Sequence, residues 1–382
     1  MLRAAPLLLL LAACTGPDLH TISPQVVRAY EVDLSSDDRE LAAAWYGERG
    51  GHARIYIQPL TAEGKAEGQP LEVTDGEREA YEPDLAFLGE DYVVAWYEKP
   101  VGGGWESAWL SRIGRHGGER WRRLLPAEGG AGLRPAVRVQ GNDIHVAWVR
   151  TLTDGTADLW YARYDSEGAE AREPRVIAPA SPDTWNLNAA LDGAGRMHVV
   201  YDAKTTTRAR ELRRVIVEGS SSSVETLTPD DGFDSLYPDI AIANDRIALT
   251  WFDTRDGNEE VYLATGTFTD SLPDRVAEAH RITNTPGHSI GAYLALNGNR
   301  LGLAWTDDTG GHTDAYFQVF SPSLDPEAPA RALLHTHDTA SIPSVAAAGS
   351  GFAIAWNEYA QDKTTEAHGE VRTSKAMLAR VR

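Results

Sequence analysis

The sequence predicts an all-β protein built from seven similar units. Seven large aromatic residues each end a short apolar run, and they follow one another at steps of 51, 52, 53, 50, 54 and 51 residues. A fixed period in this range is typical of repeat architectures. Apolar residues also alternate within each run, which is typical of strands. The aromatic residues are Trp45, Trp96, Trp148, Tyr201, Trp251, Trp305 and Trp356.

Each aromatic run has one bulky face and one small face. Five of the residues directly before the aromatic are alanine: Ala44, Ala95, Ala147, Ala304 and Ala355. Because both faces of the run are largely apolar, we expect each strand to be covered on both sides by neighbouring sheets. A small face allows a neighbouring sheet to approach closely, so that its bulky face can fill the space at native density.

The other strands of each unit follow from the same period. Thirteen residues before the aromatic, Pro83, Pro135, Pro238 and Pro343 predict the start of a first strand, where no ladder donor is needed. A third strand containing an aromatic follows a turn rich in Gly and Asp, and a weaker fourth strand closes the unit. Four antiparallel strands in about 50 residues, repeated around a ring, predict a seven-bladed β-propeller.

The two ends of the chain predict how this ring closes. The last unit has three strands and stops near Val381, whereas residues 19–22 before the first unit have the character of a fourth strand. We therefore expect the N-terminal strand to complete the last blade and remove its free edge. The propeller is expected to span residues 19–382, with no second domain.

The N-terminus has the pattern of an export signal. A basic residue, Arg3, precedes an apolar stretch from Ala4 to Ala13 that is too short to cross a bilayer. Leu11 to Cys14 resembles the lipobox of bacterial lipoproteins. This resemblance implies a signal peptide over residues 1–13, acylation (including palmitate) of Cys14 and a tether over residues 14–18.

The residue after Cys14 indicates which membrane would hold the anchored protein. In the family that the lipobox resembles, an Asp at this position favours the inner membrane, and Thr15 here favours the outer membrane if the cell has one. Cys14 is the only cysteine in the chain, so no internal disulfide can form. The alternative is an ordinary cleaved signal with an incidental cysteine.

The formal net charge of the chain is −20. This charge argues against nucleic acid as a partner, because phosphate binding needs a basic surface, and it argues against broad contact with anionic lipid. It favours solubility and repulsion between copies, so we expect a monomer. The expected partners are the membrane, through the lipid anchor, and a protein or glycan of the cell envelope.

Polar residues near the predicted first-strand starts and just after the aromatic residues should meet on one face of the ring, because the strands run alternately up and down. They form a candidate ligand-binding surface, with ordinary turn chemistry as the alternative. The candidates are Asp84, Glu98, Arg134, Arg150, Asp239, Asp253, Arg255, Asp307, Asp308 and Glu358.

No catalytic motif, nucleotide-binding motif or metal site is predicted. Oxygen-bearing side chains from Asp253 to Glu260 leave a calcium site as an alternative to a hairpin turn. His335 and His337 would point to the same side of a strand, but no third zinc ligand lies near them in the sequence.

The repeat core, in which Trp-x-Asp precedes a Gly-rich turn and a Tyr-containing strand, resembles the sialidase-like and TolB-like propellers of secreted bacterial proteins. The resemblance implies the propeller fold over nearly all of residues 20–382. It implies no sialidase activity, because the arginines, tyrosine and glutamate of the sialidase site cannot be assigned to positions here. Two hypotheses follow: a non-catalytic propeller that binds an envelope protein or glycan, and a glycan-active hydrolase with carboxylates at the propeller mouth.

Overall fold

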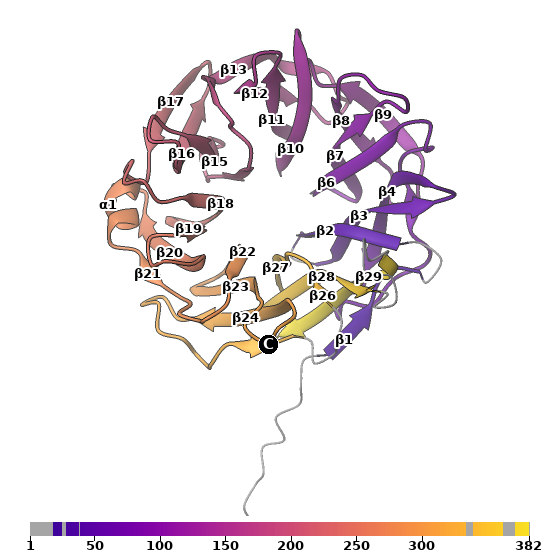
Figure 1. Ribbon diagram of the computed structural model, residues 1–382. Coiled ribbons are helices and arrows are strands. Elements are labelled where there is room, and N and C mark those ends of the chain that lie inside the picture. Colours follow the sequence, from indigo (N-terminus) through magenta and orange to yellow (C-terminus); the bar gives the residue numbers. More distant parts are fainter. Residues whose placement is uncertain (1–17, 25–27, 38, 334–338, 362–370, 382) are drawn as a thin grey trace, which may run out of the picture.

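The computed structural model describes residues 18–24, 28–37, 39–333, 339–361 and 371–381. Within these residues the chain forms seven antiparallel sheets arranged around one central axis (Figure 1). A cavity lined by the innermost strands lies along this axis, and we call it the central channel. This confirms the predicted seven-bladed propeller. Cys14 and the pair His335 and His337 lie outside the described residues. No helix among the described residues is long and apolar enough to cross a membrane.

The blades follow one another in chain order, and each begins at the channel and ends at the rim. Blade 1 contains β2 (Arg28–Ser36), β3 (Leu41–Arg49), β4 (His52–Leu60) and β5 (Leu71–Glu72). Blade 2 contains β6 (Glu79–Leu88), β7 (Asp91–Lys99), β8 (Ser107–Ile113) and β9 (Glu119–Leu124). Blade 3 contains β10 (Gly130–Gln140), β11 (Asp143–Leu152), β12 (Thr156–Tyr164) and β13 (Glu170–Pro182).

The next three blades repeat this order. Blade 4 contains β14 (Leu187–Leu191), β15 (Met197–Lys204), β16 (Arg210–Glu218) and β17 (Ser221–Thr226). Blade 5 contains β18 (Ser235–Ala243), β19 (Arg246–Asp253), β20 (Glu260–Thr267) and β21 (His280–Arg281), with the short helix α1 (Leu272–Ala277) before β21. Blade 6 contains β22 (Ser289–Asn297), β23 (Arg300–Asp307), β24 (Asp314–Phe320) and β25 (Arg331–Ala332).

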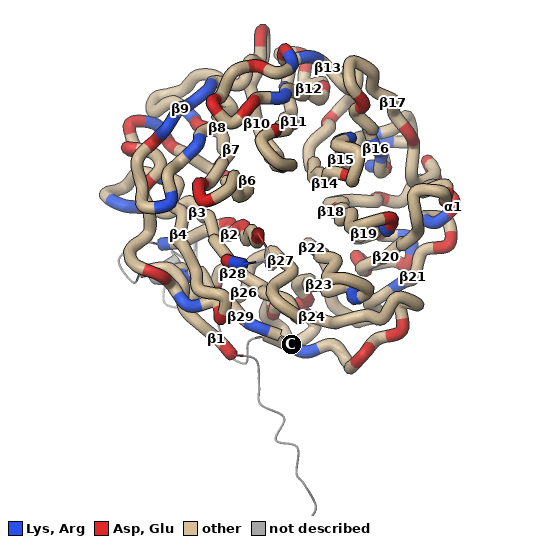
Figure 2. Tube along the Cα trace, turned by 180° about the vertical axis from the view of Figure 1, so that it is seen from behind, with Lys and Arg blue, Asp and Glu red and all other residues tan. Residues whose placement is uncertain are grey.

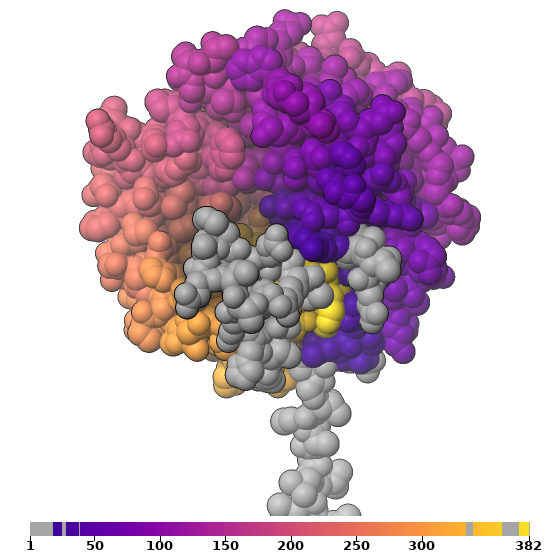
Figure 3. Space-filling view, turned by 45° about the vertical axis from the view of Figure 1, so that its right-hand side comes forward, coloured from indigo at the N-terminus to yellow at the C-terminus, as the bar shows by residue number. Residues whose placement is uncertain are grey.

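The last blade joins the two ends of the described chain. It contains β27 (Ser344–Ala348), β28 (Gly351–Gln361), β29 (Val371–Val381) and β1 (Asp18–Thr21), and the short β26 (Thr339–Ala340) also pairs with β28. β1 runs antiparallel to β29, with Asp18 opposite Arg380 and Thr21 opposite Met377. Figure 3 shows the indigo N-terminal and yellow C-terminal segments together on one side of the ring. The predicted ring closure by the N-terminal strand is confirmed.

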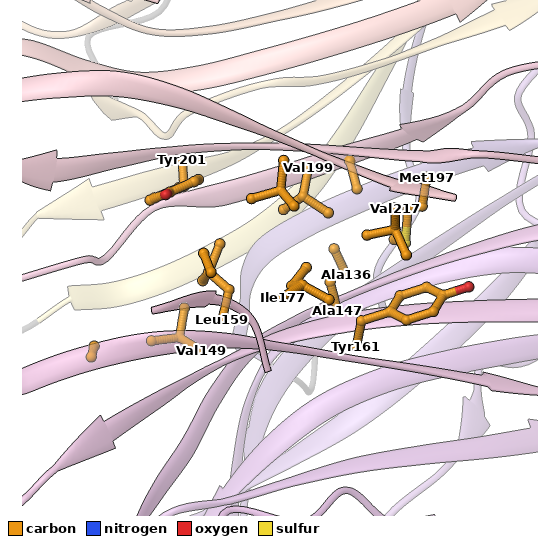
Figure 4. Close-up of a cluster of buried hydrophobic side chains, with 14 of the residues drawn as sticks. Ala136, Ala147, Val149, Leu159, Tyr161, Ile177, Met197, Val199, Tyr201 and Val217 are labelled. Atoms are coloured by element: carbon orange, nitrogen blue, oxygen red, sulfur yellow. The ribbon is translucent and has the colours of Figure 1, made fainter. Parts of the chain in front are cut away.

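Neighbouring blades pack as the alternation of bulky and small residues predicts. Trp96 of blade 2 lies in one buried cluster with Ala42 and Ala44 of blade 1. Trp356 of blade 7 likewise packs in a cluster with Ala304 of blade 6. Figure 4 shows the cluster between blades 3 and 4, where Val149 and Leu159 lie near Val199 and Tyr201. Side chains from two sheets therefore form each core, and no blade has a complete core of its own.

Of the four prolines that the sequence analysis placed at first-strand starts (the marker prolines), Pro83, Pro135 and Pro238 lie inside strands instead, whereas Pro343 directly precedes β27 as predicted. β6 begins at Glu79 and β18 at Ser235, so Pro83 and Pro238 lie inside strands. Both sit where the register shifts, between Tyr81 and Asp84 in blade 2 and between Leu236 and Asp239 in blade 5. A β-bulge leaves its extra residue out of the ladder, so it tolerates a residue that has no N–H group.

The N-terminal strand should contribute measurably to stability, because Ile22 beside it is 2% exposed and its N–H donates to the carbonyl of Ala376 at 2.9 Å. Deleting residues 19–23 should lower the melting temperature by roughly 5 °C or more, because it removes this contact and frees the edge of β29. Thermal unfolding followed by circular dichroism measures the effect, and an unchanged melting curve would contradict closure of the ring by β1.

Candidate functional site

A bulge recurs at the same place in five of the seven innermost strands. The ladder shifts register near the start of β2, β6, β10, β18 and β22. At each shift one residue has a left-handed backbone: Glu31, Glu82, Arg134, Tyr237 and Gly291, with φ between 47° and 60°. L-residues other than glycine rarely adopt this conformation, and bulges of this kind re-aim side chains, often beside functional sites.

The bulge residues lie at one mouth of the central channel. The channel has a volume of about 1030 Å³, and its lining includes Glu31, Glu82, Arg134 and Tyr237. The acidic residues of β2 and β6 are visible beside the channel in Figure 2. In blade 6 the position is glycine, because a Cβ on Gly291 would come within 2.5 Å of Ile342 in blade 7. Four blades therefore present a side chain to the channel at this position, where blade 6 has none.

Two charged bulge residues, Glu82 and Arg134, are paired at this mouth, and the charge of each acts on Glu31. Arg134 Nη2 lies 3.3 Å from Glu82 Oε1, and Arg134 Nη1 donates to Asn186 Oδ1 at 3.1 Å. The guanidinium also lies 4.8 Å from the ring centre of Trp185, which is a cation–π arrangement. Arg134 is therefore held in one orientation by a carboxylate, an amide and an indole ring.

The two glutamates at this mouth differ in their surroundings. Burial in the channel wall, reinforced by the charge of Glu82, raises the pKa of Glu31, and Arg134 opposes that rise. Burial also raises the pKa of Glu82, but Arg134 and a hydrogen bond from the Tyr97 hydroxyl both favour its ionised form. Glu31 is therefore the more readily protonated carboxyl of the two.

Five tyrosines form a continuous arc beside these charges. Their ring centres are 5.8 Å apart for Tyr359 and Tyr30, 5.2 Å for Tyr30 and Tyr46, 5.1 Å for Tyr46 and Tyr81, and 5.6 Å for Tyr81 and Tyr97. This tyrosine arc crosses blades 7, 1 and 2. Tyrosine combines an apolar ring with a hydroxyl that can donate and accept hydrogen bonds, so the arc offers both kinds of contact.

A second layer lies two residues further along the inner strands, where aspartates connect neighbouring blades. Asp33 Oδ2 accepts the N–H of Leu85 at 2.8 Å, and Asp239 Oδ2 accepts the N–H of Leu294 at 2.8 Å. Asp84 accepts the N–H of Val137 in the same way. The Oγ of Ser344 makes the corresponding contact from the last blade to the first, because it accepts the N–H of Leu34 at 3.0 Å. These contacts hold each inner strand in register with the next blade.

Arg138 is the cation of this second layer. Its Nη1 lies 2.8 Å from Asp84 Oδ2, and its Nε donates to the carbonyl of Ala189 at 2.7 Å. Burial raises the pKa of Asp239 to about 6, although the N–H of Leu294 and the charge of Arg138 lower it. One arginine thus faces several channel aspartates, which favours retention of a proton on some of them.

The sequence-predicted candidates fall into two groups. Arg134, Asp84 and Asp239 lie in the channel. The others end or follow the second strands and are used within their own blades. Arg255 pairs with Asp253 at 2.5 Å, Arg150 pairs with Asp158 at 2.5 Å, and Glu98 accepts the indole N–H of Trp96 at 3.0 Å.

The remaining candidates are also engaged or buried. Asp307 accepts the hydroxyl of Ser289 at 2.7 Å, and Asp308 accepts the N–H of His288 at 2.7 Å. Glu358 is buried on β28. The segment from Asp253 to Glu260 forms the connection between β19 and β20, and the described residues contain no group of three or more His, Cys, Asp or Glu that could hold a metal ion.

The sequence reasoning missed Glu31, Glu82, Tyr237 and the tyrosine arc. A signal for the bulge residues was present in the sequence as a fixed spacing. Each stands fourteen residues before the aromatic residue of its unit: Glu31, Glu82, Arg134 and Tyr237. The marker proline follows this position directly in three of these units, so the pattern was visible. The spacing alone does not show that these side chains face the channel, because the bulge in the folded strand turns them there.

Comparisons with known proteins support the fold and assign no family. No protein-family model matches the sequence, and no curated protein matches it. The polysaccharide lyase Uly1 matches in structure with a TM-score of 0.56, 9% identity and coverage of 94% of this chain and 91% of that chain. The endosialidase of phage phi92 matches with a TM-score of 0.53, 11% identity and coverage of 96% and 69%.

A third structure completes the comparison. An α-L-arabinofuranosidase from Fusarium graminearum matches with a TM-score of 0.52, 10% identity and coverage of 81% of this chain and 98% of that chain. At these identities the likenesses show a shared propeller fold alone, and they assign no residue of this chain a role.

The Asp239 carboxyl should make stability depend on pH. Its pKa of about 6 in the folded state lies above the ordinary value of 3.8, so its contribution to stability is present below about pH 4 and is lost as the pH rises through about 6. The free energy of unfolding of Asp239→Asn relative to wild type should therefore rise by up to about 2–3 kcal/mol between pH 4 and pH 7.

Urea unfolding across this pH range measures the difference. Asp245→Asn, in the exposed turn between β18 and β19 of the same blade, is the matched control and should show no such trend. A difference between Asp239→Asn and wild type that does not change with pH would contradict the burial of a titrating carboxyl at this position.

Proposed function

We propose that the chain binds a carbohydrate at the mouth of its central channel. The observation that carries the proposal is a cavity of about 1030 Å³ that is lined by Glu31, Glu82 and Arg134 and also by Tyr359, the tyrosine at one end of the arc. Sugar rings have apolar C–H faces that pack on aromatic rings, and hydroxyl groups that bond to carboxylates and guanidinium groups.

The sequence analysis left a protein as the alternative to a glycan ligand. The shape of this site favours the glycan. The cavity is concave, and its polar groups converge from several blades, which is typical of a site for a small or extended ligand. The similar structures are, by their names, a polysaccharide lyase, an endosialidase and an arabinofuranosidase, and these names agree with a carbohydrate ligand. If Cys14 is acylated as predicted, the short tether would hold the propeller, and with it this binding site, close to a membrane.

Binding should depend on both halves of the site. Tyr359→Ala removes the ring of the arc that lines the cavity and Arg134→Ala removes a donor group, and each should weaken binding of an oligosaccharide by about tenfold or more. Isothermal titration with oligosaccharides first selected on a glycan array measures this. Arg331→Ala, on the exposed edge strand β25, is the control. Equal affinity of all three variants and wild type would contradict a ligand at the mouth.

A second candidate function, cleavage of the bound glycan, is favoured by the different surroundings of Glu31 and Glu82. Glu31, whose pKa is raised, can give a proton to the glycosidic oxygen as the bond from that oxygen to the anomeric carbon breaks. A water molecule then adds to the anomeric carbon, and Glu82, whose ionised form the charge of Arg134 favours, takes its proton. The products are two shorter sugars, one of which has a new reducing end.

Cleavage would give a signature that binding alone does not. Glu31→Gln and Glu82→Gln should each lower the release of reducing ends by a hundredfold or more, about the range of acid–base catalysis, while the oligosaccharide still binds. Activity should fall as the pH rises past the raised pKa of Glu31, because the proton donor is then lost. Glu90→Gln, in the exposed turn between β6 and β7, is the control. Full activity in both glutamine variants would contradict the assigned pair.

A further inference from the structure

At one position near the start of the third strand, several blades have a charged residue that pairs with an opposite charge in the same blade. In blade 5, Glu260 at the start of β20 accepts a hydrogen bond from Arg281 Nη2 at 2.9 Å and one from the hydroxyl of Thr283 at 2.5 Å. In blade 1 the charges are exchanged, and Arg54 pairs with Glu72. In blade 3, Asp158 at this position pairs with Arg150.

Blade 4 has the same local structure as blade 5. The N–H of Leu212 donates to Thr228 Oγ1 at 2.8 Å, as the N–H of Val261 does to Thr283 Oγ1 at 2.8 Å. The backbone bond between Leu227 and Leu212 likewise corresponds to the one between Ile282 and Val261. Glu211 is therefore the counterpart of Glu260, and Thr228 is the counterpart of Thr283.

The cation is missing from this arrangement in blade 4. The counterpart of Arg281 is Thr226, and the counterpart of Thr285 is a second acid, Asp230. Glu211 is 1% exposed, and Thr228 donates a hydrogen bond to its Oε2. Among the described residues, Glu211 Oε1 has no hydrogen-bond partner. A buried carboxylate oxygen without a partner costs free energy, so this oxygen is suited to an external donor.

A pocket lies where the missing arginine would be. It has a volume of about 500 Å³, and its lining includes Glu211, Thr226, Thr228, Asp230 and Thr206. We call it the Glu211 pocket. Lys204 and Arg213 also line it, but Lys204 pairs with Asp183 at 2.5 Å, and Arg213 bonds to the hydroxyl of Tyr201.

The charges around the pocket favour a cation. Burial raises the pKa of Glu211 to about 7, and Asp231, Asp253 and Asp230 reinforce the rise, whereas the hydrogen bond from Thr228 opposes it. The net charge of the chain, −20, also attracts a positively charged partner. Blade 4 therefore has the acid at this place in the repeat but Thr226 in place of the arginine that pairs with it in blade 5.

We propose that the Glu211 pocket binds a guanidinium group supplied from outside the chain, as in the arginine side chain of a peptide or protein partner. The ligand class follows from blade 5, where a guanidinium occupies the corresponding place beside Glu260. Its planar set of N–H donors suits a carboxylate better than a compact ammonium does. The site is separate from the channel mouth and does not depend on the function proposed there.

The test titrates the full chain with N-acetyl-arginine amide and, as a matched cation, N-acetyl-lysine amide, by isothermal titration calorimetry. Wild type and Glu218→Gln, at the exposed far end of β16, should bind the arginine compound equally. Glu211→Gln should weaken binding by about tenfold or more. Thr226→Arg should abolish binding and raise the melting temperature, because the new side chain recreates the pair seen in blade 5.

Three results would overturn the proposal: no saturable binding of the arginine compound to wild type, equal binding to Glu211→Gln, or unchanged binding to Thr226→Arg. Equal binding of the lysine compound would overturn the assignment to guanidinium. If Glu211→Gln does not fold, Thr226→Arg decides alone, since it adds a counter-ion and leaves the buried acid in place.

Discussion

The bulge near the start of the inner strands is the constraint on which the channel mouth depends. In a regular strand, successive side chains point to opposite faces of the blade and pack against its neighbours. The extra residue at each bulge, with its left-handed backbone, instead presents Glu31, Glu82, Arg134 and Tyr237 to the channel. This conformation costs on the order of 1 kcal/mol or more for each residue other than glycine. Packing between the blades offsets this strain, and the strained backbone places these side chains at the channel mouth.

Packing between blades explains why the ring can tolerate such strain. Trp96 and Trp356 are fully buried against alanines of the preceding blade, and aspartates such as Asp33 and Asp239 hold the backbone of the next inner strand. Removing one blade would expose two apolar faces, so the blades are stable only together. The N-terminal strand matters for the same reason, because it covers the last free edge.

The sequence was sufficient for the fold, and it was insufficient for the site. The period of the aromatic residues and the alternation of bulky and small residues predicted seven blades and their closure, because these features depend on local pattern and burial. Pro83, Pro135 and Pro238 were misplaced because neither a bulge nor a strand start requires a backbone N–H group at that residue. Glu98, Asp253 and Asp307 looked like a free surface, but their contacts with Trp96, Arg255 and Ser289 depend on folded geometry that spacing does not reveal. Acylation of Cys14 stays a prediction from the sequence.

The substitution Glu31→Gly tests the link between bulge and site most directly. Glycine adopts the left-handed backbone without strain, as Gly291 does in blade 6, so the free energy of unfolding should stay unchanged or rise by up to about 1 kcal/mol. Affinity for the oligosaccharide should fall, because glycine removes the whole polar side chain at this position, whereas glutamine keeps hydrogen-bonding groups there. Urea unfolding and calorimetric titration of the same preparation measure both quantities. A clear loss of stability with undiminished affinity would contradict the account.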